Sequence, residues 1–247
     1  MRKERTHCQV EVIPPPQEDT TRYAFEKFAY IVAHDLNGPL RRIVNFVQLL
    51  EKKYRPVLDL QALHYIDLIA DNGRRAQAHL AGLLQYSRLD TVPLTRQKVD
   101  CKALVEHCLR QLKAEFENRE ALIHVGPLPQ VTADGERLGL LFYCLISNAL
   151  KFCKERPDID ISARREHDGW IFSVRDRGIG IAPRDHEAIF DIFRHLHTDN
   201  EYPGNGMGLT LAKRIAELHG GSIEVDSHPD DGAAFYVTLP DRAAFDR

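Results

Sequence analysis

The chain has 247 residues and a formal net charge of −3, with acidic and basic residues interspersed along it. This balance gives no strong basic field, which argues against a nucleic-acid partner or an anionic membrane surface. No apolar run approaches the roughly 18 to 20 residues that cross a bilayer, and the opening residues lack the apolar core of a signal peptide. We therefore expect a cytoplasmic protein with no membrane span in this chain. Its cysteines, odd in number and without Cys-x-x-Cys spacing, predict reduced thiols in the core.

The first part of the chain predicts a helical hairpin. Residues 1–21 contain consecutive prolines followed by polar residues, which is typical of an extended or disordered lead-in. Apolar residues then recur at steps of three and four over residues 23–54 and again over residues 63–87. Two helices alone would leave much of these stripes exposed to water. We therefore expect residues 22–93 to dimerise into a four-helix bundle.

Beyond Pro93 the pattern changes and predicts a second domain over residues 94–241, with a short tail at 242–247. Helical periodicity mixes there with short apolar or alternating runs, which favours an α/β sandwich and an α+β fold for the whole chain. The expected helices cover residues 99–116, 135–153 and 209–219, and the expected strands lie near residues 123–124, 131–133, 159–163, 170–174, 223–225 and 234–239.

His34 is a candidate nucleophile on the first helix. At about 100° per residue it falls nearly opposite the apolar stripe, so its imidazole is expected to face solvent. An exposed neutral imidazole is a competent nitrogen nucleophile, and the neighbouring Asp35 can hold its ring proton. Gly38 and Pro39 predict a kink just after His34. The helix alone favours the simpler interpretation, an ordinary histidine on a solvated face.

Two elements of the second domain predict contacts to ATP and Mg²⁺. Asn148 and Lys151 share one helix face, where an amide oxygen can ligate Mg²⁺ and an ammonium can meet phosphate oxygens. Asp176 follows an apolar strand and can accept a hydrogen bond from the exocyclic amine of adenine, where guanine presents a carbonyl. Gly178 and Gly180 permit the backbone to approach a ligand. Each element alone is a weak signal.

The third element, GNGMGL, predicts an anion site. Gly204, Gly206 and Gly208 open a helix expected to begin at Leu209, and backbone N–H groups at a helix N-terminus suit phosphates. A dinucleotide-binding loop would need a buried strand before these glycines, and the residues there are polar. A Walker-type loop is also excluded, because no Gly-Lys-Ser or Gly-Lys-Thr occurs.

In chain order, the segments FAYIVAHDLNGPLRRI, NALKF, DRGIGI, IFDIF and GNGMGL resemble the motifs of sensor histidine kinases, with the phytochrome-type kinases most similar. The resemblance runs from about Tyr23 to Pro240. It implies a homodimeric helical bundle bearing the phospho-acceptor His34 and its helper Asp35, followed by an ATP-binding sandwich of the gyrase and Hsp90 kind. It also implies phosphoryl transfer to the receiver domain of a response regulator. The sequence shows no sensor domain, which could lie upstream of this chain or on another chain.

The same resemblance assigns roles to individual residues. Phe190 and Phe193 would pack the root of a mobile nucleotide lid. The nucleotide contacts that it implies are Asn148 for Mg²⁺, Lys151 for phosphate, Asp176 for adenine, and Gly178, Gly180, Gly204, Gly206, Gly208 and Leu209 for the lid.

Three positions depart from the family pattern. Gly38 stands where many members carry Thr or Asn, a residue associated with dephosphorylating the partner. Cys144 stands where many carry a second Asn, one turn before Asn148. An Arg commonly stands two residues after the second Phe, whereas Arg194 directly follows Phe193 and His195 takes the later place. The sequence leaves open which of these two side chains reaches the γ-phosphate.

Two other functions remain possible from the sequence. The first is a degenerate kinase that binds nucleotide and acts as a dimeric docking scaffold. The second is a gyrase-like or chaperone-like ATPase, which needs a carboxylate to activate water. Cys144 occupies the helical turn where that carboxylate is expected, so the sequence favours the kinase.

Overall fold

The computed structural model describes residues 17–117, 119–153, 156–167, 169–196, 202 and 204–241. The predicted tail at 242–247 and most of the predicted lead-in lie outside the described residues. Residues 17–21 belong to the first helix, so this end of the predicted lead-in is helical rather than extended. For residues 17–30, His34 and Phe116, only the backbone is described.

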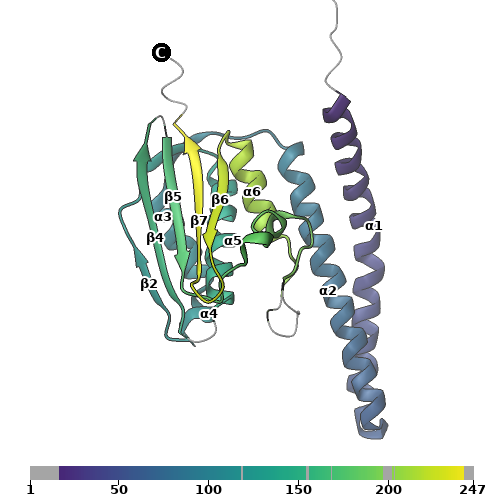
Figure 1. Ribbon diagram of the computed structural model, residues 1–247. Coiled ribbons are helices and arrows are strands. Elements are labelled where there is room, and N and C mark those ends of the chain that lie inside the picture. Colours follow the sequence, from purple (N-terminus) through teal and green to yellow (C-terminus); the bar gives the residue numbers. More distant parts are fainter. Residues whose placement is uncertain are drawn as a thin grey trace, which may run out of the picture.

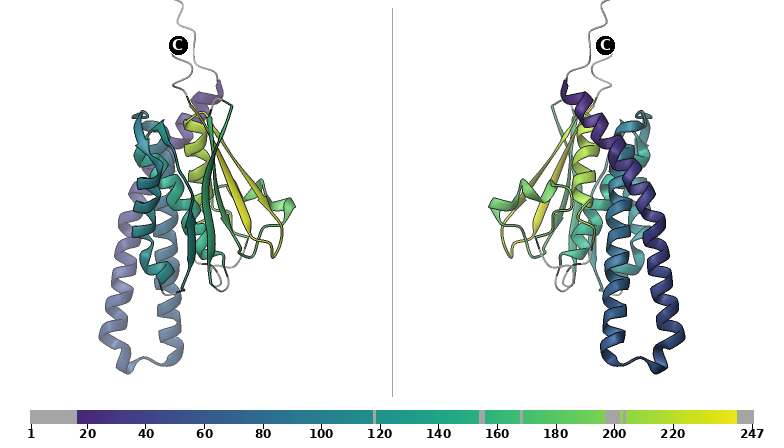
Figure 2. Two further views of the ribbon diagram at one scale, coloured as in Figure 1. Left: turned by 90° about the vertical axis from the view of Figure 1, so that its left-hand side faces the viewer. Right: turned by 90° about the vertical axis from the view of Figure 1, so that its right-hand side faces the viewer.

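The predicted helical hairpin is confirmed. Helix α1 (Gln17–Tyr54) runs through Pro39 as one helix and leads through a 3₁₀ turn, η1 (Arg55–Val57), into α2 (Leu60–Thr91). The Asp59 carboxylate caps α2 by accepting a hydrogen bond from the backbone N–H of Ala62 at 2.7 Å. Figure 2 shows the two helices lying antiparallel beside the second half of the chain.

The two helices pack through small residues on their facing sides. A Cβ atom at Gly73 would lie 2.5 Å from Cγ2 of Val44, so α2 requires glycine there to approach α1 this closely. Much apolar surface is left over, with side chains 44–86% exposed. These residues are Ile31, Leu36, Ile43, Phe46, Leu49, Leu50, Tyr54, Val57, Leu60, Tyr65, Leu68 and Ile69.

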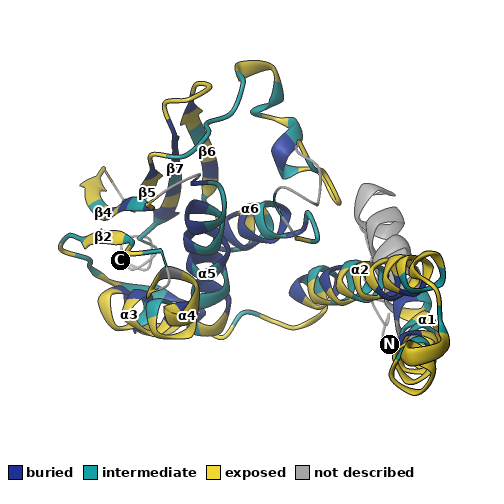
Figure 3. Ribbon diagram, turned by 90° about the horizontal axis from the view of Figure 1, so that it is seen from below, coloured by how far each residue is buried: buried dark blue, intermediate teal, exposed yellow. Residues whose placement is uncertain are grey.

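The second half is an α/β sandwich, as predicted. Its five-stranded sheet has the order β2-β4-β5-β7-β6, with β2 parallel to β4 and the other pairs antiparallel. Helices cover one face of this sheet, and their buried sides turn toward it (Figures 1 and 3). The strands are β2 (Leu122–Val125), β4 (Asp158–Glu166), β5 (Gly169–Asp176), β6 (Ser222–Ser227) and β7 (Ala233–Pro240), and the helices are α3 (Cys101–Gln111), α4 (Lys113–Glu117), α5 (Gly135–Lys151) and α6 (Gly208–Leu218).

One expected helix is shorter than predicted and is preceded by a strand. Residues 97–100 form β1 (Gln97–Asp100), which pairs with β3 (Gln130–Ala133), so the helix predicted from residue 99 begins at Cys101. The physical reason is the Asp100 side chain, which accepts hydrogen bonds from the N–H groups of Lys102 and Ala103 and so caps α3. Cys101, Cys108, Cys144 and Cys153 are buried free thiols, as expected.

The sandwich is docked against the C-terminal half of α2. Near the end of α2, Arg214 of α6 forms a bidentate ion pair with Asp90, its Nε lying 2.8 and 3.1 Å from the two carboxylate oxygens. One turn of α2 also approaches the loop before α6, where a Cβ atom at Gly82 would lie 2.6 Å from Cγ of Met207. Helix α1 lies on the other side of α2, away from the sandwich (Figures 1 and 3).

The core between α5 and the sheet is centred on two aromatic rings. Phe142 and Phe172 are each at most 1% exposed, and their rings meet edge to face with centroids 5.4 Å apart. We expect Phe172→Ala to lower the free energy of unfolding by about 3–5 kcal/mol, because it removes the aromatic contact and leaves a cavity. Urea denaturation measures this loss. Thr238→Ala, at an exposed position of the same sheet, should cost about 1 kcal/mol or less, and similar losses in both variants would contradict the placement of this core.

Candidate active site

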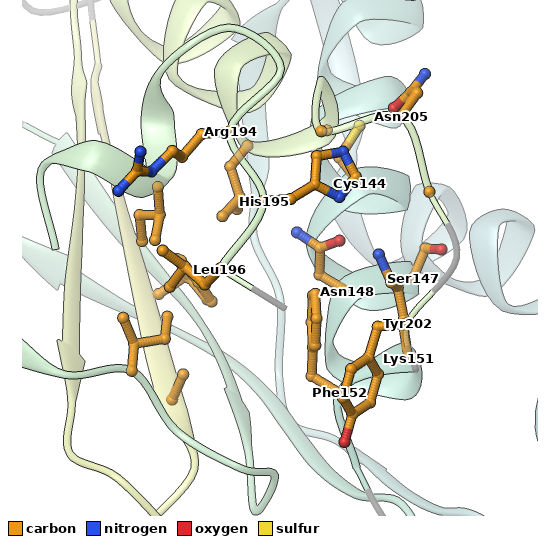
Figure 4. A pocket seen from close by; sticks show the side chains of 18 of the residues that line it. Cys144, Ser147, Asn148, Lys151, Phe152, Arg194, His195, Leu196, Tyr202 and Asn205 are labelled. Atoms are coloured by element: carbon orange, nitrogen blue, oxygen red, sulfur yellow. The ribbon is translucent and has the colours of Figure 1, made fainter. Parts of the chain in front are cut away.

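A cavity of about 310 Å³ opens between α5, the end of β5 and the loops that precede α6. Its lining includes Asn148 and Lys151 from α5, Asp176 from β5, and the glycines that lead into α6. Most of the predicted nucleotide residues, distant in sequence, therefore meet in one place, whereas Gly178 and Phe193 are not among the lining residues. Figure 4 shows this cavity with its side chains.

Asp176 is the last residue of β5 and is only 4% exposed. Its Oδ1 accepts hydrogen bonds from the backbone N–H of Gly178 at 2.8 Å and of Ala233 at 3.3 Å. Burial raises the pKa of the carboxyl to about 6, while these two N–H groups work in the opposite direction. At neutral pH the group is therefore mainly a carboxylate, which can accept a hydrogen bond from a base that enters the cavity.

Gly178 and Gly180 form the turn that holds this carboxylate. A Cβ atom at Gly178 would lie 2.6 Å from the carbonyl oxygen of Phe152, and at Gly180, where φ is +69°, it would lie 1.8 Å from the carbonyl oxygen of His228. Both positions therefore exclude side chains because neighbouring backbone fills the space. Close approach of a ligand to these glycines stays a prediction.

The second glycine cluster, residues 204–208, faces α5. At Gly204 a Cβ atom would lie 2.7 Å from Nζ of Lys151, and at Gly206, where φ is +65°, it would lie 2.7 Å from Nε2 of His195. Gly208 has only ordinary contacts, with Asn148 Oδ1 3.9 Å from its Cβ position. Helix α6 begins at Gly208, one residue before the predicted start, and Leu209 in its first turn lines the cavity.

On α5 the cavity-facing side chains are spaced by about one helical turn. Cys144, Asn148 and Lys151 all line the cavity and point into it in Figure 4. Burial raises the pKa of the Cys144 thiol to about 12, so at neutral pH it is protonated. The turn before Asn148 therefore offers no base.

The segment after η3 (Ala188–Phe190) carries the two candidate phosphate contacts, Arg194 and His195, and directs their side chains to different sides. Phe193 has a φ of +60°, and its ring packs against that of His79 on α2 at 4.9 Å between centroids. Arg194, predicted among the nucleotide contacts, is exposed, and its guanidinium points away from α5 in Figure 4. The His195 imidazole points toward Asn148 and Cys144. Although both residues border the cavity, only His195 turns inward.

Other lining residues were not predicted from the sequence. The rings of Phe152 and Tyr202 pack in a tilted arrangement with centroids 5.1 Å apart, and both line the cavity. Gln85 reaches the cavity from α2. Phe152 could have been predicted to line the cavity, because it directly follows Lys151 in the sequence. Gln85 could not, because only the docking of α2 against the sandwich brings it to the cavity.

The predicted phospho-acceptor lies apart from the cavity. His34 belongs to α1 by its backbone, and its side chain lies outside the described residues, so its predicted orientation stays a prediction. The adjacent Asp35 is exposed and Ala33 is fully buried. Asp35 is not among the described residues that line the cavity.

Both halves of the chain match known protein families. Residues 26–92 match the His Kinase A (phospho-acceptor) domain, and residues 133–243 match the histidine kinase-, DNA gyrase B- and HSP90-like ATPases. The chain is 41% identical over 216 residues to the phytochrome-like protein Cph1 of Synechocystis sp.. The chain belongs to the sensor histidine kinases. Its sandwich is accordingly the ATP-binding domain of this family.

Further relatives place the kinase among phytochrome-type members. It is 42% identical over 216 residues to cyanobacterial phytochrome A of Nostoc sp., an alignment that covers 87% of this chain. The chain spans only 29% and 28% of the lengths of Cph1 and cyanobacterial phytochrome A. Among solved structures, full-length ShkA in complex with AMPPNP superposes with a TM-score of 0.66 at 25% identity, covering 87% of this chain and 46% of that one. Within the described residues, no helix of the kinase is long and apolar enough to cross a membrane.

Asp176→Asn tests whether this end of the cavity binds the nucleotide base. We expect ATP affinity to fall by roughly tenfold or more, because a charge-assisted hydrogen bond is lost. The preference for ATP over GTP should weaken too, because an amide can donate as well as accept. Titration calorimetry with both nucleotides measures these effects. Asp160→Asn, at an exposed position on β4, is the control, and unchanged binding in Asp176→Asn would move the base elsewhere.

The same substitution should stabilise the nucleotide-free kinase. The pKa of Asp176 is raised from 3.8 to about 6 on folding, so the carboxyl destabilises the fold increasingly as pH rises through this window. Asp176→Asn removes this penalty, and the free energy of unfolding at pH 7 should rise by on the order of 1–3 kcal/mol. Well below pH 3.8 the wild-type carboxyl is protonated in both the folded and the unfolded state, and the gain should vanish. A variant that is less stable than wild type at pH 7 would contradict the burial of this charge.

Proposed function

We propose that this chain is the catalytic core of an ATP-dependent protein-histidine kinase, which phosphorylates its own His34 and passes the phosphoryl group to an aspartate of a response regulator. The observation that supports this most is the convergence of Asn148, Lys151 and Asp176 on one cavity, together with Gly180 and the glycines of residues 204–208. The same chain also matches a phospho-acceptor domain. We further propose a boundary between the two domains near residues 93 and 94, and a cytoplasmic location where ATP is supplied.

Phosphoryl transfer asks for positioning and for neutralisation of charge on the phosphates. Asp176 would hold adenine at one end of the cavity, and Lys151 would meet phosphate oxygens. The residues fit Mg²⁺ as well, because Asn148 presents an amide oxygen next to Gly208, where the absence of a side chain leaves room. Asn148 would hold the ion, and bound Mg²⁺ would neutralise negative charge on the phosphates. The N–H groups of residues 204–208 would complete the phosphate site.

The imidazole of His34 would act as the nucleophile. Asp35, exposed beside it, would keep the proton on one ring nitrogen so that the other retains its lone pair. Because α1 lies beyond α2 from the sandwich (Figure 1), an acceptor in this arrangement is not presented to the cavity of its own chain. Transfer would need either movement of the ATP-binding domain or the acceptor of a second copy.

The exposed apolar side chains of the hairpin favour a homodimer. Single apolar residues are common on protein surfaces, but a continuous set along two helices is typical of an interface. A four-helix bundle formed by two hairpins would cover them. The receiver domain of the regulator would dock on this bundle near His34. A sensor domain outside this chain is part of the proposal, and the length of the relatives supports it.

His34→Gln tests the acceptor. Incubation with γ-labelled ATP should leave no label on the variant, while the ATP dissociation constant should stay within a few-fold of wild type because the acceptor lies outside the cavity. His64→Gln, at an exposed position of the same hairpin, should retain the label. Label persisting on His34→Gln would refute the assignment, and wild-type protein that binds ATP without becoming labelled would favour the docking scaffold instead.

Cys144→Glu tests why ATP should phosphorylate histidine rather than water. A protonated thiol cannot take a proton from water, so we expect slow ATP hydrolysis by the wild-type chain. A glutamate at this position adds a base one turn from Asn148 and should raise phosphate release, with an upper range of about 10²–10⁴-fold. Cys144→Gln, similar in size but without the base, should not. Wild-type turnover on the order of 1 s⁻¹ or faster would instead support a dedicated ATPase.

A further inference from the structure

The linker between the two domains is held by buried side chains at the start of α5. Residues 92–96 form this linker, which leaves the end of α2 and crosses to the sandwich (Figure 1). The Asp134 carboxylate accepts a hydrogen bond from the backbone N–H of Thr95 at 3.0 Å. The Arg137 guanidinium donates a hydrogen bond to the carbonyl of Val92. Both Asp134 and Arg137 are only 8% exposed. Movement of the sandwich relative to the hairpin must therefore be accommodated by a segment that is bound to α5 at two points.

A buried histidine holds the backbone of Asp134 in turn. His219, the residue that ends α6, is only 2% exposed. Its Nε2 lies 3.0 Å from the backbone nitrogen of Asp134, and its Nδ1 lies 2.8 Å from the carbonyl oxygen of Ile215. Because a backbone N–H only donates and a carbonyl only accepts, the ring must be neutral with its proton on Nδ1. His219 thus connects the end of α6 to the start of α5 and, through Asp134, to the linker.

Charged groups from several segments surround this ring. Burial lowers the pKa of His219. Its hydrogen bond to the α6 carbonyl and the nearby Asp134 carboxylate oppose this shift, whereas the guanidiniums of Arg96 in the linker and Arg137 on α5 add to it. Asp241, which borders the same small cavity after β7, already has an arginine partner on β4. The neutral ring is therefore the stable form at neutral pH, and acid is needed to charge it.

We propose that His219 is a positioning residue for the joint between the two domains: the neutral ring holds Asp134 so that its carboxylate binds the linker, and the protonated ring draws that carboxylate away. A proton taken up from solvent occupies Nε2, which can then no longer accept from the N–H of Asp134. The new N⁺–H group donates most strongly to a carboxylate, and Asp134 carries one on the residue already in contact. When this carboxylate turns to the imidazolium, the N–H of Thr95 loses its acceptor and the linker is free to move. None of these side chains lines the nucleotide cavity.

The direction of the pH effect follows from the two states of the chain. Because the pKa of His219 is lower in the folded chain than in the unfolded chain, the unfolded chain binds more protons in mild acid. The stability that the neutral ring contributes is complete above the ordinary histidine pKa of about 6.5 and is lost as the pH falls below it. Asp176 also titrates near pH 6, but it destabilises the fold as the pH rises. Its contribution is the same in the wild type and in a His219 variant, so a comparison of the two removes it.

Two measurements test this role of His219. NMR of ¹⁵N-labelled histidine side chains determines the tautomer of His219, whose signal is identified by its absence in His219→Gln. Hydrogen–deuterium exchange at pH 7.5 and pH 5, corrected for the intrinsic pH dependence of exchange, measures the protection of the linker amides. Glutamine can accept from the N–H of Asp134 with its amide oxygen but does not titrate. His107→Gln, at an exposed position of α3, is the control, and peptides from β5 and β7 verify that the sheet stays folded.

We expect a single tautomer of His219 at pH 7.5, with its proton on Nδ1. Between pH 7.5 and pH 5 the protection of the Thr95 amide in the wild type should fall by roughly three- to tenfold, the scale of losing one hydrogen bond. His219→Gln should keep the linker protected at both pH values. His107→Gln should lose protection in acid as the wild type does.

Three results would overturn the proposal, and the first needs no variant. A His219 ring with its proton on Nε2 at pH 7.5 would contradict the contact with Asp134. Unchanged protection of the wild-type linker at pH 5 would show that the carboxylate stays on Thr95. Loss of protection in acid that persists in His219→Gln would assign the titration to another group. A linker that is unprotected at both pH values in His219→Gln, with the sheet still protected, would support the proposal, because glutamine then fails to replace the ring as an acceptor.

Discussion

The ion pair between Asp90 and Arg214 fixes where the nucleotide cavity lies relative to the helical hairpin. Both side chains are largely buried, 10% and 15% exposed, so removing one partner would leave the other charge largely buried and without its bidentate contact. Two turns of α2 earlier, Gly82 admits Met207, and the Asn205 amide donates a hydrogen bond to the carbonyl of Ala78 at 3.3 Å. Helix α2 thus holds the loop that leads into α6, and it separates α1 from the cavity.

The buried carboxylate of Asp176 lowers the stability of the fold. Asp176 is buried where its charge is unfavourable, and the backbone N–H groups of Gly178 and Ala233 offset only part of this cost. Burial of Cys144 costs little by comparison, because its thiol is neutral and packs like a small apolar side chain. The site therefore combines a buried hydrogen-bond acceptor, which suits the proposed base, with a wall that offers no base to activate water. This combination suits transfer to a protein side chain better than hydrolysis.

The elements that the sequence predicted well are those with local signals. The period of the apolar residues predicted the hairpin, and a strand ending in Asp176 with two glycines beyond it predicted one end of the cavity. Strand β1 was missed because Asp100 caps a helix inside a stretch that looks helical from residue 99. Contacts between distant parts of the chain could not be predicted from local patterns, and the position of Gln85 at the cavity is an example. The inward direction of the His195 side chain depends on a positive φ at Phe193. The sequence does not predict this conformation, because it is uncommon for residues other than glycine.

The central claim is that ATP bound in this cavity phosphorylates His34. The most direct measurement is to incubate the chain with γ-labelled ATP and Mg²⁺ and to map the modified residue by mass spectrometry under alkaline conditions that preserve phosphohistidine. The account predicts a single phosphate, labile in acid and stable in alkali, on the tryptic peptide that contains His34. Acid-stable label, or phosphohistidine at another position such as His79 or His195, would contradict it.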